Sequence, residues 1–308
     1  MYRFENVAEM YHEMSKELLN NGTKVCPRGN ETKEILTPVI QIENPGSNLA
    51  YLPERKFNVV YALVESLMLL QKKKDTKYFT EFNARMGTFS DDGTTLNGAY
   101  GYRIAENIDN IVNRLKEDKD TRQAIVNIYN NDISIHTKDT PCTIALHFII
   151  RDNKLNMITY MRSNDIIWGT PYDMFMFTNL QRAISLELWV GLGWYRHIPT
   201  SLHVYKDHYD LLDAMKDCES IPTYMPFDTH ELRIIGQDYI DFVDDGKIHN
   251  TKIISGNDNL IDIEGRKIRN IIYNEKCYRD KIWASENSFE LTHDVPFWTD
   301  NFTKRWWK

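Results

Sequence analysis

Residues 141–177, PCTIALHFIIRDNKLNMITYMRSNDIIWGTPYDMFMF, set the expectations for the fold. Two apolar runs rich in β-forming residues, CTIALHFII and KLNMITYM, are separated by Arg151-Asp152-Asn153, which is typical of a hairpin. The polar cluster RSND follows the second run, and Gly169-Thr170-Pro171 then precedes an apolar run. The stretch therefore predicts two antiparallel strands, a tight corner and a buried helix, expected over 174–188.

A cysteine opens the first of these strands, and an arginine follows the second. If the strands pair, the hairpin brings Cys142 and Arg162 to the same edge. A free thiol titrates at about 8.5 and a neighbouring cation lowers that pKa, so Arg162 is expected to favour the Cys142 thiolate. The same guanidinium could bind a phosphate. The alternative is an inert buried cysteine beside a surface arginine.

Several motifs in one order favour the reactive interpretation: Pro141-Cys142, RSND at 162–165, Gly169-Thr170-Pro171-Tyr172-Asp173 and His203-Val204-Tyr205. Together they resemble the thymidylate synthase family of pyrimidine-nucleotide C5-modifying enzymes. The resemblance implies an α+β fold, a single domain over 1–308 in which a mixed or antiparallel sheet packs with helices. It also implies a homodimer through the sheet with shared active sites. Past Cys218 the likeness fades, so 222–308 is expected to diverge, with β-hairpins over 222–265.

The resemblance also implies roles for individual residues. Cys142 would be the nucleophile, Glu65 the acid, base and water organiser, and Asp173 the reader of the base, with Tyr100 near the cysteine. The implied nucleotide ligands are Arg28, Arg122, Arg162 and Ser163 for the phosphate and His203 and Tyr205 for the sugar. Arg122 would reach across the dimer interface to the partner's phosphate. Asp165 and Gly169 match positions beside the folate.

Two of these assignments have support in the residues themselves. Glu65 lies in the apolar run FNVVYALVESLMLL at 57–70, where an acid is costly unless it is paired, exposed or functional. His203 and Tyr205 alternate along a predicted strand, so they share one face. Simple alternatives remain: a helix-edge glutamate facing solvent and a pair of core-edge side chains.

Two positions depart from the synthases proper. Those enzymes read the pyrimidine with asparagine where this sequence has Asp173, and they usually carry cysteine where it has Asn164. In both respects the sequence is most similar to the cytidylate hydroxymethylase branch. The implied cofactor is 5,10-methylenetetrahydrofolate, and the implied reaction transfers a one-carbon unit to C5 of dCMP or CMP, followed by hydration.

Three alternatives stay open. The first is methylation of dUMP or dCMP, and the second is a non-catalytic protein that binds pyrimidine nucleotides. The third concerns Asp173, which could merely cap a helix beginning at Met174.

Composition narrows the class of protein. The chain has 308 residues, 42% of them hydrophobic, and a net charge of −7, so it has no basic surplus to suggest nucleic-acid binding. Its four cysteines are scattered and form no metal-binding pattern. The first residues read as a helix over 4–19, with neither a signal peptide nor a membrane span expected. Residues 189–198 are expected to contain turns. A reduced, cytoplasmic protein is the expectation.

Overall fold

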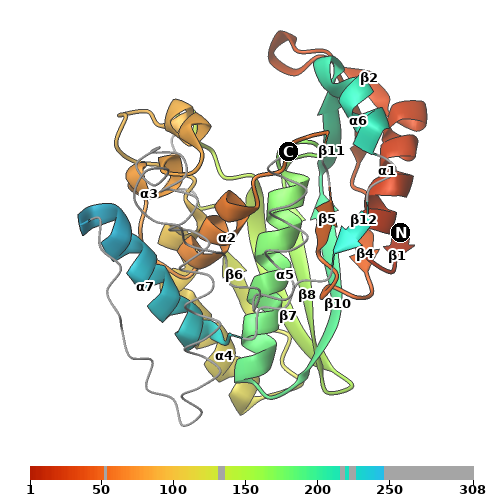
Figure 1. The fold of residues 1–308 in the computed structure, drawn as a ribbon. Helices are drawn as coiled ribbons and strands as arrows, with labels where there is room; N and C mark the ends of the chain where they lie inside the picture. Colours follow the sequence, from red (N-terminus) through yellow and green to blue (C-terminus); the bar gives the residue numbers. More distant parts are fainter. Residues whose placement is uncertain (52–53, 131–135, 216–218, 222–226, 246–308) are drawn as a thin grey trace, which may run out of the picture.

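A mixed sheet with helices packed on it forms the body of the protein. The computed structural model describes residues 1–51, 54–130, 136–215, 219–221 and 227–245 (Figure 1). Cys218, Cys277 and the expected hairpin segments at 222–226 and 246–265 lie outside the described residues. Helices and mixed sheets occur together, which confirms the α+β class. In the described ranges, no helix is long and apolar enough to cross a membrane.

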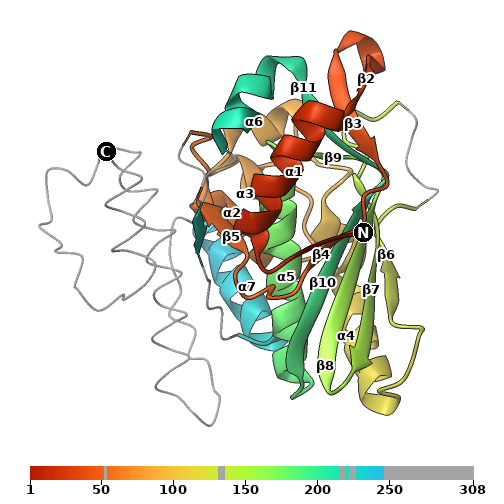
Figure 2. The same cartoon turned by 90° about the vertical axis from the view of Figure 1, so that its right-hand side faces the viewer.

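The largest sheet has six strands and mixed directions. Its order is β1 (Tyr2–Phe4), β4 (Ile40–Ile42), β10 (Gly191–Pro199), β8 (Lys154–Met161), β7 (Thr143–Arg151) and β6 (Ile125–Asn127). The pairs β1/β4 and β10/β8 are parallel, and the other neighbours are antiparallel. Figure 2 shows β6, β7, β8 and β10 as one layer with α5 along one side of it.

The central hairpin forms as predicted, with a shorter turn. Arg151 pairs with Lys154, so the turn consists of Asp152 and Asn153 alone. Both have positive φ, 51° and 55°, which Asp and Asn tolerate better than most residues. The register of β7 on β8 shifts between Thr143 and Ala145, directly after Cys142. The strand therefore changes pairing at the point where the cysteine enters the sheet.

Helices cover the inner face of this sheet. Helix α5 (Thr170–Glu187) packs on β8 and β10, α2 (Val59–Met68) packs on α5, and α7 (Thr229–Asp245) packs on both helices (Figure 1). Helix α4 (Tyr100–Glu117) lies beside β6 and β7. Phe175, Phe177 and Ile184 of α5 are fully buried, as an apolar helix between a sheet and other helices requires.

Among the described residues, two smaller sheets and several short helical elements complete the fold. A four-stranded sheet has the order β2 (Thr23–Val25), β3 (Thr32–Leu36), β11 (Ser201–Tyr205) and β9 (Asn164–Asp165), and β5 (Leu49–Tyr51) pairs with β12 (Glu219–Ile221). Shorter helical elements are α3 (Lys77–Thr80), α6 (Tyr209–Met215), η1 (Pro27–Gly29), η2 (Ala84–Phe89) and η3 (Lys206–His208). The four-stranded sheet matters most for function, because β9 and β11 carry predicted site residues.

Two helices begin elsewhere than predicted. Helix α1 (Val7–Asn21) starts three residues later than the expected 4–19, because the Asn6 side chain accepts a hydrogen bond from the backbone N–H of Glu9 and caps the helix there. Helix α5 starts at Thr170 instead of Met174, with Pro171 in its first turn, where its missing N–H costs nothing. The backbone N–H of Asp173 already donates to the carbonyl of Gly169, so Asp173 is not the cap of this helix.

Two further predictions were wrong. Residues 189–198, expected to contain turns, belong mostly to β10, whose glycines allow close strand contact: a Cβ on Gly193 would lie 2.2 Å from Asn156 Oδ1. Within 222–265, the described part contains helix α7 in place of a hairpin, because Leu232, Ile235 and Tyr239 recur at helical spacing and are buried.

Candidate active site

One cleft of about 590 Å³ gathers nearly all of the predicted site residues. It opens between α2, the start of α4, the residues before β7, the loop from β8 to α5, and β11. The predicted residues that line it are Arg28, Glu65, Tyr100, Cys142, Arg162, Ser163, Asp165, Gly169, Asp173, His203 and Tyr205. Segments far apart in the sequence therefore meet at one site, as the motif order predicts.

Cys142 and Arg162 lie side by side at the entrance to the hairpin. The backbone N–H of Arg162 donates to the carbonyl of Cys142 at 2.8 Å, and Arg162 Nη2 lies 3.5 Å from Cys142 Sγ. The guanidinium also donates to the carbonyls of Pro141 at 2.9 Å and Thr140 at 2.8 Å. These bonds fix the cation beside the sulfur, and the strand pairing supplies the geometry.

The charge state of Cys142 differs from the expectation. Burial raises the pKa of the Cys142 thiol, and this effect exceeds the opposing influence of the Arg162 guanidinium. The carboxyls of Asp173 and Asp139 also raise this pKa, and Arg28 lowers it. Arg162 thus acts in the predicted direction, but the sequence reasoning omitted the larger desolvation effect. The thiol form predominates in the free protein at neutral pH.

Glu65 projects from α2 into the cleft without a firm partner. Burial raises the pKa of its carboxyl to about 8, with a smaller upward contribution from Asp173 and downward ones from Tyr61 and Arg55. In the described residues, neither Glu65 Oε2 nor the Tyr61 hydroxyl makes a hydrogen bond of ordinary geometry. Glu65 is therefore a mostly protonated acid at neutral pH that can exchange its proton with a ligand or water.

Asp173 is the second buried acid of the cleft, and it is firmly held. Its Oδ2 accepts a hydrogen bond from Asn164 Nδ2 at 2.7 Å. Burial raises the pKa of its carboxyl to about 7, although the Asn164 bond opposes the shift. Gly169 makes room for this pair, because a Cβ there would lie 2.8 Å from Asn164 Nδ2. The structure thus gives Gly169 a spatial reason to lack a side chain.

Tyr100 lies at the first turn of α4 and faces the same cleft. Its ring stacks on Phe177 of α5 with the centroids 5.9 Å apart. The next residue, Gly101, allows α4 to approach the end of α2, since a Cβ there would lie 2.0 Å from the carbonyl oxygen of Met68. This close contact sets the position of Tyr100.

The predicted sugar and phosphate ligands lie along β11 and the loop beside it. His203 and Tyr205 share a strand face, with their rings 5.2 Å apart and nearly perpendicular. Ser163 Oγ lies 3.5 Å from His203 Nδ1. Arg28, in a left-handed conformation with φ 53°, contributes an exposed cation to the same cleft. A polar, cationic wall of this kind suits a phosphorylated sugar.

Asp165 and Arg122 differ from the other predicted residues in where they lie and what they contact. Asp165 lines the cleft, and its Oδ1 accepts hydrogen bonds from the backbone N–H groups of Ile167 at 2.7 Å and Trp168 at 3.1 Å, so it also shapes the loop. Arg122 does not line this cleft; it is exposed just before β6. Arg122 therefore lies apart from the cleft that gathers the other predicted ligands.

Sequence reasoning missed an aromatic and cationic wall of the cleft. The Arg55 guanidinium carbon lies 4.9 Å from the centroid of the Trp168 ring and 4.8 Å from that of Tyr172, and Arg85 lies 5.3 Å from the Trp168 ring. Arg55 is 6% exposed and donates to the carbonyl of Ile167. Arg55 lies two residues before the apolar run that contains Glu65, which was the one signal that could have pointed to it.

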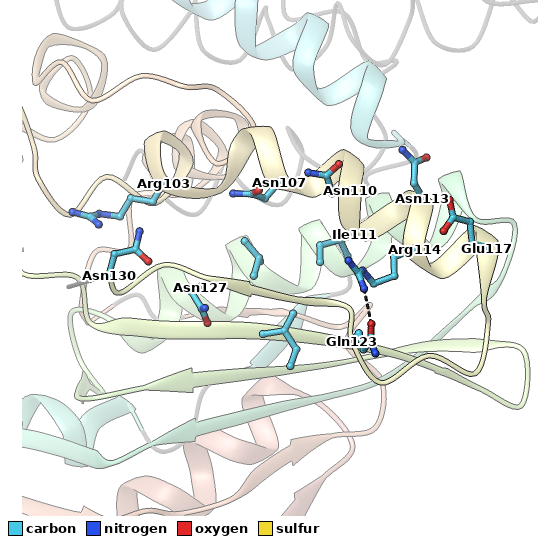
Figure 3. Close-up of a pocket in the computed structure, with 12 residues that line it drawn as sticks. Arg103, Asn107, Asn110, Ile111, Asn113, Arg114, Glu117, Gln123, Asn127 and Asn130 are labelled. Carbon is cyan, nitrogen blue, oxygen red and sulfur yellow. Dashed lines mark hydrogen bonds between the residues drawn. The ribbon is translucent and has the colours of Figure 1, made fainter. Parts of the chain in front are cut away.

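A second hollow, of about 720 Å³, lies between α4 and β6 and contains none of the predicted site residues (Figure 3). Half of its lining side chains are amides, and Asn107 and Asn110 come from α4 and Asn127 from β6 (Figure 3). Arg114 donates to Gln123 Oε1 at 2.7 Å across it. With no thiol and no buried acid in its lining, this hollow lacks the chemistry of the first cleft.

The fold and cleft define a class: an α+β protein with a thiol, two buried acids and a cationic wall that suits a nucleotide. The thymidylate synthase family model matches residues 9–248, and the chain belongs to that family. Members of this family use methylenetetrahydrofolate as the one-carbon donor.

Curated relatives fall into two groups. The deoxyuridylate hydroxymethyltransferase of Bacillus phage SP01 is 34% identical over 230 residues, which are 68% of this chain and 60% of that protein. That of Pseudomonas phage M6 is 29% identical, with 70% and 65% covered. Thymidylate synthase 1 of Bacillus spizizenii is 27% identical over 273 residues, 79% of this chain and 94% of that protein. The chain thus spans less than two thirds of the length of these phage relatives.

Proposed function

We propose that this protein transfers a one-carbon unit from 5,10-methylenetetrahydrofolate to C5 of a cytidine monophosphate, dCMP or CMP, and that hydration then gives the 5-hydroxymethyl nucleotide. The observation that carries the proposal is the pairing of Asp173 with Asn164 in a cleft that also contains Cys142 and Glu65. An acid, rather than an amide, faces the site at the position that the resemblance assigns to reading the base.

The reaction at the base follows from the side chains in the cleft. Cys142 loses its proton and its sulfur bonds to C6 of the pyrimidine, which converts C5 into a nucleophilic carbon. After C5 has gained the one-carbon unit and lost its proton, water would replace the folate nitrogen at the transferred carbon and give the hydroxymethyl group. Cleavage of the sulfur–C6 bond would then restore the C5–C6 double bond and the thiol. Glu65, with a pKa of about 8, can donate a proton at neutral pH and accept one when it is ionised.

The phosphate of a bound nucleotide is negatively charged and does not help Cys142 to form a thiolate. The positive charges of the arginines therefore have to offset the charge of the phosphate. Arg162 is held beside the sulfur by backbone carbonyls, and Arg28 lies at the same cleft. Both lower the pKa of the thiol. A phosphate bound by them and by Ser163 would fix the nucleotide with its base toward Asp173.

The missed wall of the cleft fits the folate. Trp168 and Tyr172 present flat rings, and Arg55 and Arg85 place cations beside them. A planar heteroaromatic ring with carboxylates on its tail is complementary to such a surface. When bound there, the folate supplies the one-carbon unit that no common side chain carries. Trp168, Tyr172 and Arg55 would hold it, with Asp165 near its polar edge.

The choice of cytosine rests on hydrogen-bond complementarity. Cytosine presents an N4 amino donor and an N3 acceptor, whereas uracil presents an O4 acceptor and an N3–H donor. With a pKa of about 7, Asp173 carries a proton in part of the molecules at neutral pH, and a protonated carboxyl offers one acceptor and one donor. The phage relatives are named for deoxyuridylate, so uracil is the specific competitor.

The test is mass analysis of the products from dCMP, CMP and dUMP, each supplied with methylenetetrahydrofolate. We expect a gain of CH₂O on a cytidine nucleotide and no formation of dihydrofolate. Methylation would instead give dihydrofolate, detectable by its absorbance, and turnover of dUMP alone would refute the cytidylate proposal. A non-catalytic relative would form no product and no covalent adduct with a 5-fluoropyrimidine nucleotide.

Asp173→Asn tests the base reader itself. Asparagine is nearly isosteric with aspartate and offers an oxygen to N3–H and an NH₂ to O4 of uracil. We expect the ratio of kcat/KM for dCMP to that for dUMP to fall by at least about tenfold, since mismatched buried polar groups are strongly rejected. An unchanged ratio would exclude Asp173 as the reader.

The homodimer is a second part of the proposal. Ile125, Ile144 and Tyr160 are exposed apolar side chains on β6, β7 and β8, and Arg122 lies at the same edge outside its own cleft. These positions support a dimer through the sheet in which Arg122 binds the partner's phosphate. Mixing Arg122→Ala with Cys142→Ser should then restore part of the activity, because hybrid dimers contain one intact site. A fully active monomer by sedimentation would contradict this.

A further inference from the structure

A line of buried polar side chains continues from Asp173 into the protein interior. Asn164 Nδ2 donates to Asp173 Oδ2, and Asn164 Oδ1 lies 2.8 Å from His197 Nε2. His197 Nδ1 lies 3.0 Å from the Tyr195 hydroxyl, which lies 3.0 Å from Thr159 Oγ1. Asn164 is 3% exposed, and the side chains behind it are completely buried. None of the last three residues lines the cleft.

The register of the sheet places these groups in a row. His197 of β10 pairs with Thr159 of β8, and Tyr195 lies two residues before His197 on the same strand face. That face lies under α5, whose first turn carries Thr170 and Asp173. Thr170 Oγ1 also donates to Asn164 Oδ1, at 2.6 Å. The amide of Asn164 is thus held from the sheet side and from the helix side.

The direction of each hydrogen bond follows from the two ends. An ionised Asp173 can only accept, so Asn164 must present its NH₂ to Asp173 and its oxygen to His197. Burial holds the pKa of His197 at about 3, so its ring is neutral and has one N–H. That N–H must be at Nε2 to meet the Asn164 oxygen. Nδ1 then accepts the one hydrogen of the Tyr195 hydroxyl. The Tyr195 and Thr159 hydroxyls, 3.0 Å apart, can each donate to the other by rotating, so Thr159 becomes the donor of that pair.

This arrangement makes the two oxygens of Asp173 chemically different. Oδ2 faces an N–H donor and therefore cannot carry the proton of the neutral acid without a clash of two hydrogens. When Asp173 is protonated, the proton must lie on Oδ1. The carboxyl then shows a pyrimidine one fixed acceptor and one fixed donor, in a constant order. Pyrimidines whose edges differ in the order of donor and acceptor are distinguished by such a group.

We propose that His197 is a positioning residue for base selection, which, through Asn164, keeps the proton of Asp173 off Oδ2. This inference rests on the proposed role of Asp173 as base reader. If His197 no longer fixes the Asn164 amide, the amide can turn over and present its oxygen to Asp173. The proton can then lie on either carboxyl oxygen, and the site accepts either order of donor and acceptor. Discrimination between cytosine and uracil falls, whichever base the unaltered protein prefers.

The test compares three variants by the ratio of kcat/KM for dCMP to that for dUMP. His197→Leu removes the N–H that holds Asn164, and Tyr195→Phe removes the group that sets the His197 tautomer. His197→Gln places an amide N–H near the position of Nε2 and should rescue the effect. We expect the ratio to move toward unity by about tenfold in His197→Leu, less in Tyr195→Phe and within about threefold of normal in His197→Gln.

The control separates base selection from a general loss of stability. Tyr239→Phe also deletes a buried hydroxyl, which donates to the Tyr78 carbonyl at 2.6 Å, but it lies on α7 outside the cleft. Thermal unfolding midpoints are measured for all variants. The control should lower the midpoint without changing the ratio, because a structural defect affects turnover of both nucleotides alike.

The outcomes distinguish the inference from the proposed function. If Asp173→Asn changes the ratio while a folded His197→Leu does not, the inference is wrong and the base reader stands. If His197→Leu does not fold, Tyr195→Phe decides in the same way. If Asp173→Asn leaves the ratio unchanged, the proposed reader is wrong and the inference fails with it.

Discussion

The two buried acids of the cleft, Glu65 and Asp173, are desolvated alike but connected differently. Burial is the largest cause of a raised pKa in both, to about 8 for Glu65 and about 7 for Asp173. Among the described residues, Oε2 of Glu65 makes no hydrogen bond of ordinary geometry and has only the loosely placed Tyr61 hydroxyl nearby, whereas Oδ2 of Asp173 is held by Asn164 and the side chains behind it. An acid without a fixed partner can move protons, and an acid with one can recognise a donor pattern.

Removing the thiol should have the largest effect on turnover, because both acids act on the pyrimidine that Cys142 binds covalently. We expect Cys142→Ser to lower turnover by several orders of magnitude, since an alkoxide is far harder to form than a thiolate. Nucleotide binding, measured by calorimetry, should persist because Arg28, Arg162 and Ser163 remain. Cys26, exposed and outside the cleft, provides the control: Cys26→Ser should keep full activity. Near-normal turnover in Cys142→Ser would disprove the covalent mechanism.

Glu65→Gln tests whether Glu65 is the acid that transfers protons. An amide keeps the shape but cannot exchange a proton, so turnover should fall by about 10²- to 10⁴-fold. The ratio of kcat/KM for dCMP to that for dUMP should stay within about threefold of normal, because the Asn164–Asp173 contact is intact. Asp173→Asn should do the opposite and mainly move that ratio. If Glu65→Gln changed base preference as much as Asp173→Asn, the two acids would not have separate roles.

The smallest expected effect is a pH dependence of stability. Both acids bind protons more tightly in the folded chain than in the unfolded one, where their pKa values are near the ordinary 4.5 and 3.8. The stabilisation is complete below those values and is lost as pH rises through about 7 for Asp173 and about 8 for Glu65.

Denaturant unfolding between pH 5 and 9 should therefore show a free energy of unfolding that decreases with pH. Glu65→Gln should flatten the upper part of this slope, and Asp173→Asn the lower part. A slope that is the same in both variants and in the unaltered protein would show that the two acids are not protonated in the fold.

The sequence predicted the parts of the site that local pattern determines. The apolar runs on either side of Asp152-Asn153 specify the hairpin, and the hairpin by itself brings Cys142 to Arg162. The direction of the Arg162 effect on the pKa of Cys142 was predicted, but the larger effect of burial was omitted, because the number of atoms that bury a thiol depends on the whole fold. Partners from distant segments, such as Arg55 beside Trp168, have no local signature either.

The side chains behind Asn164 could not be found for a different reason. The glycines of β10 suggested turns. In the structure Gly193 lies within the strand, where the lack of a side chain leaves room for Asn156 of the neighbouring strand. With β10 misread as turns, His197 and Tyr195 had no strand face and hence no relation to Thr159. Helix α7 was also missed. Its Leu232, Ile235 and Tyr239 recur at helical spacing, but the helices that bury them, α2 and α5, come from distant parts of the sequence.

The empty space at Gly169 restricts the order in which this site can change over generations. A methyl group there would lie 2.8 Å from the Asn164 amide nitrogen, so alanine at 169 is tolerated only after residue 164 has become shorter. A shorter residue at 164, however, releases Asp173 before any replacement reader exists. Positions 164 and 169 therefore cannot change independently, and a chain that keeps Asn164 has to keep glycine at 169.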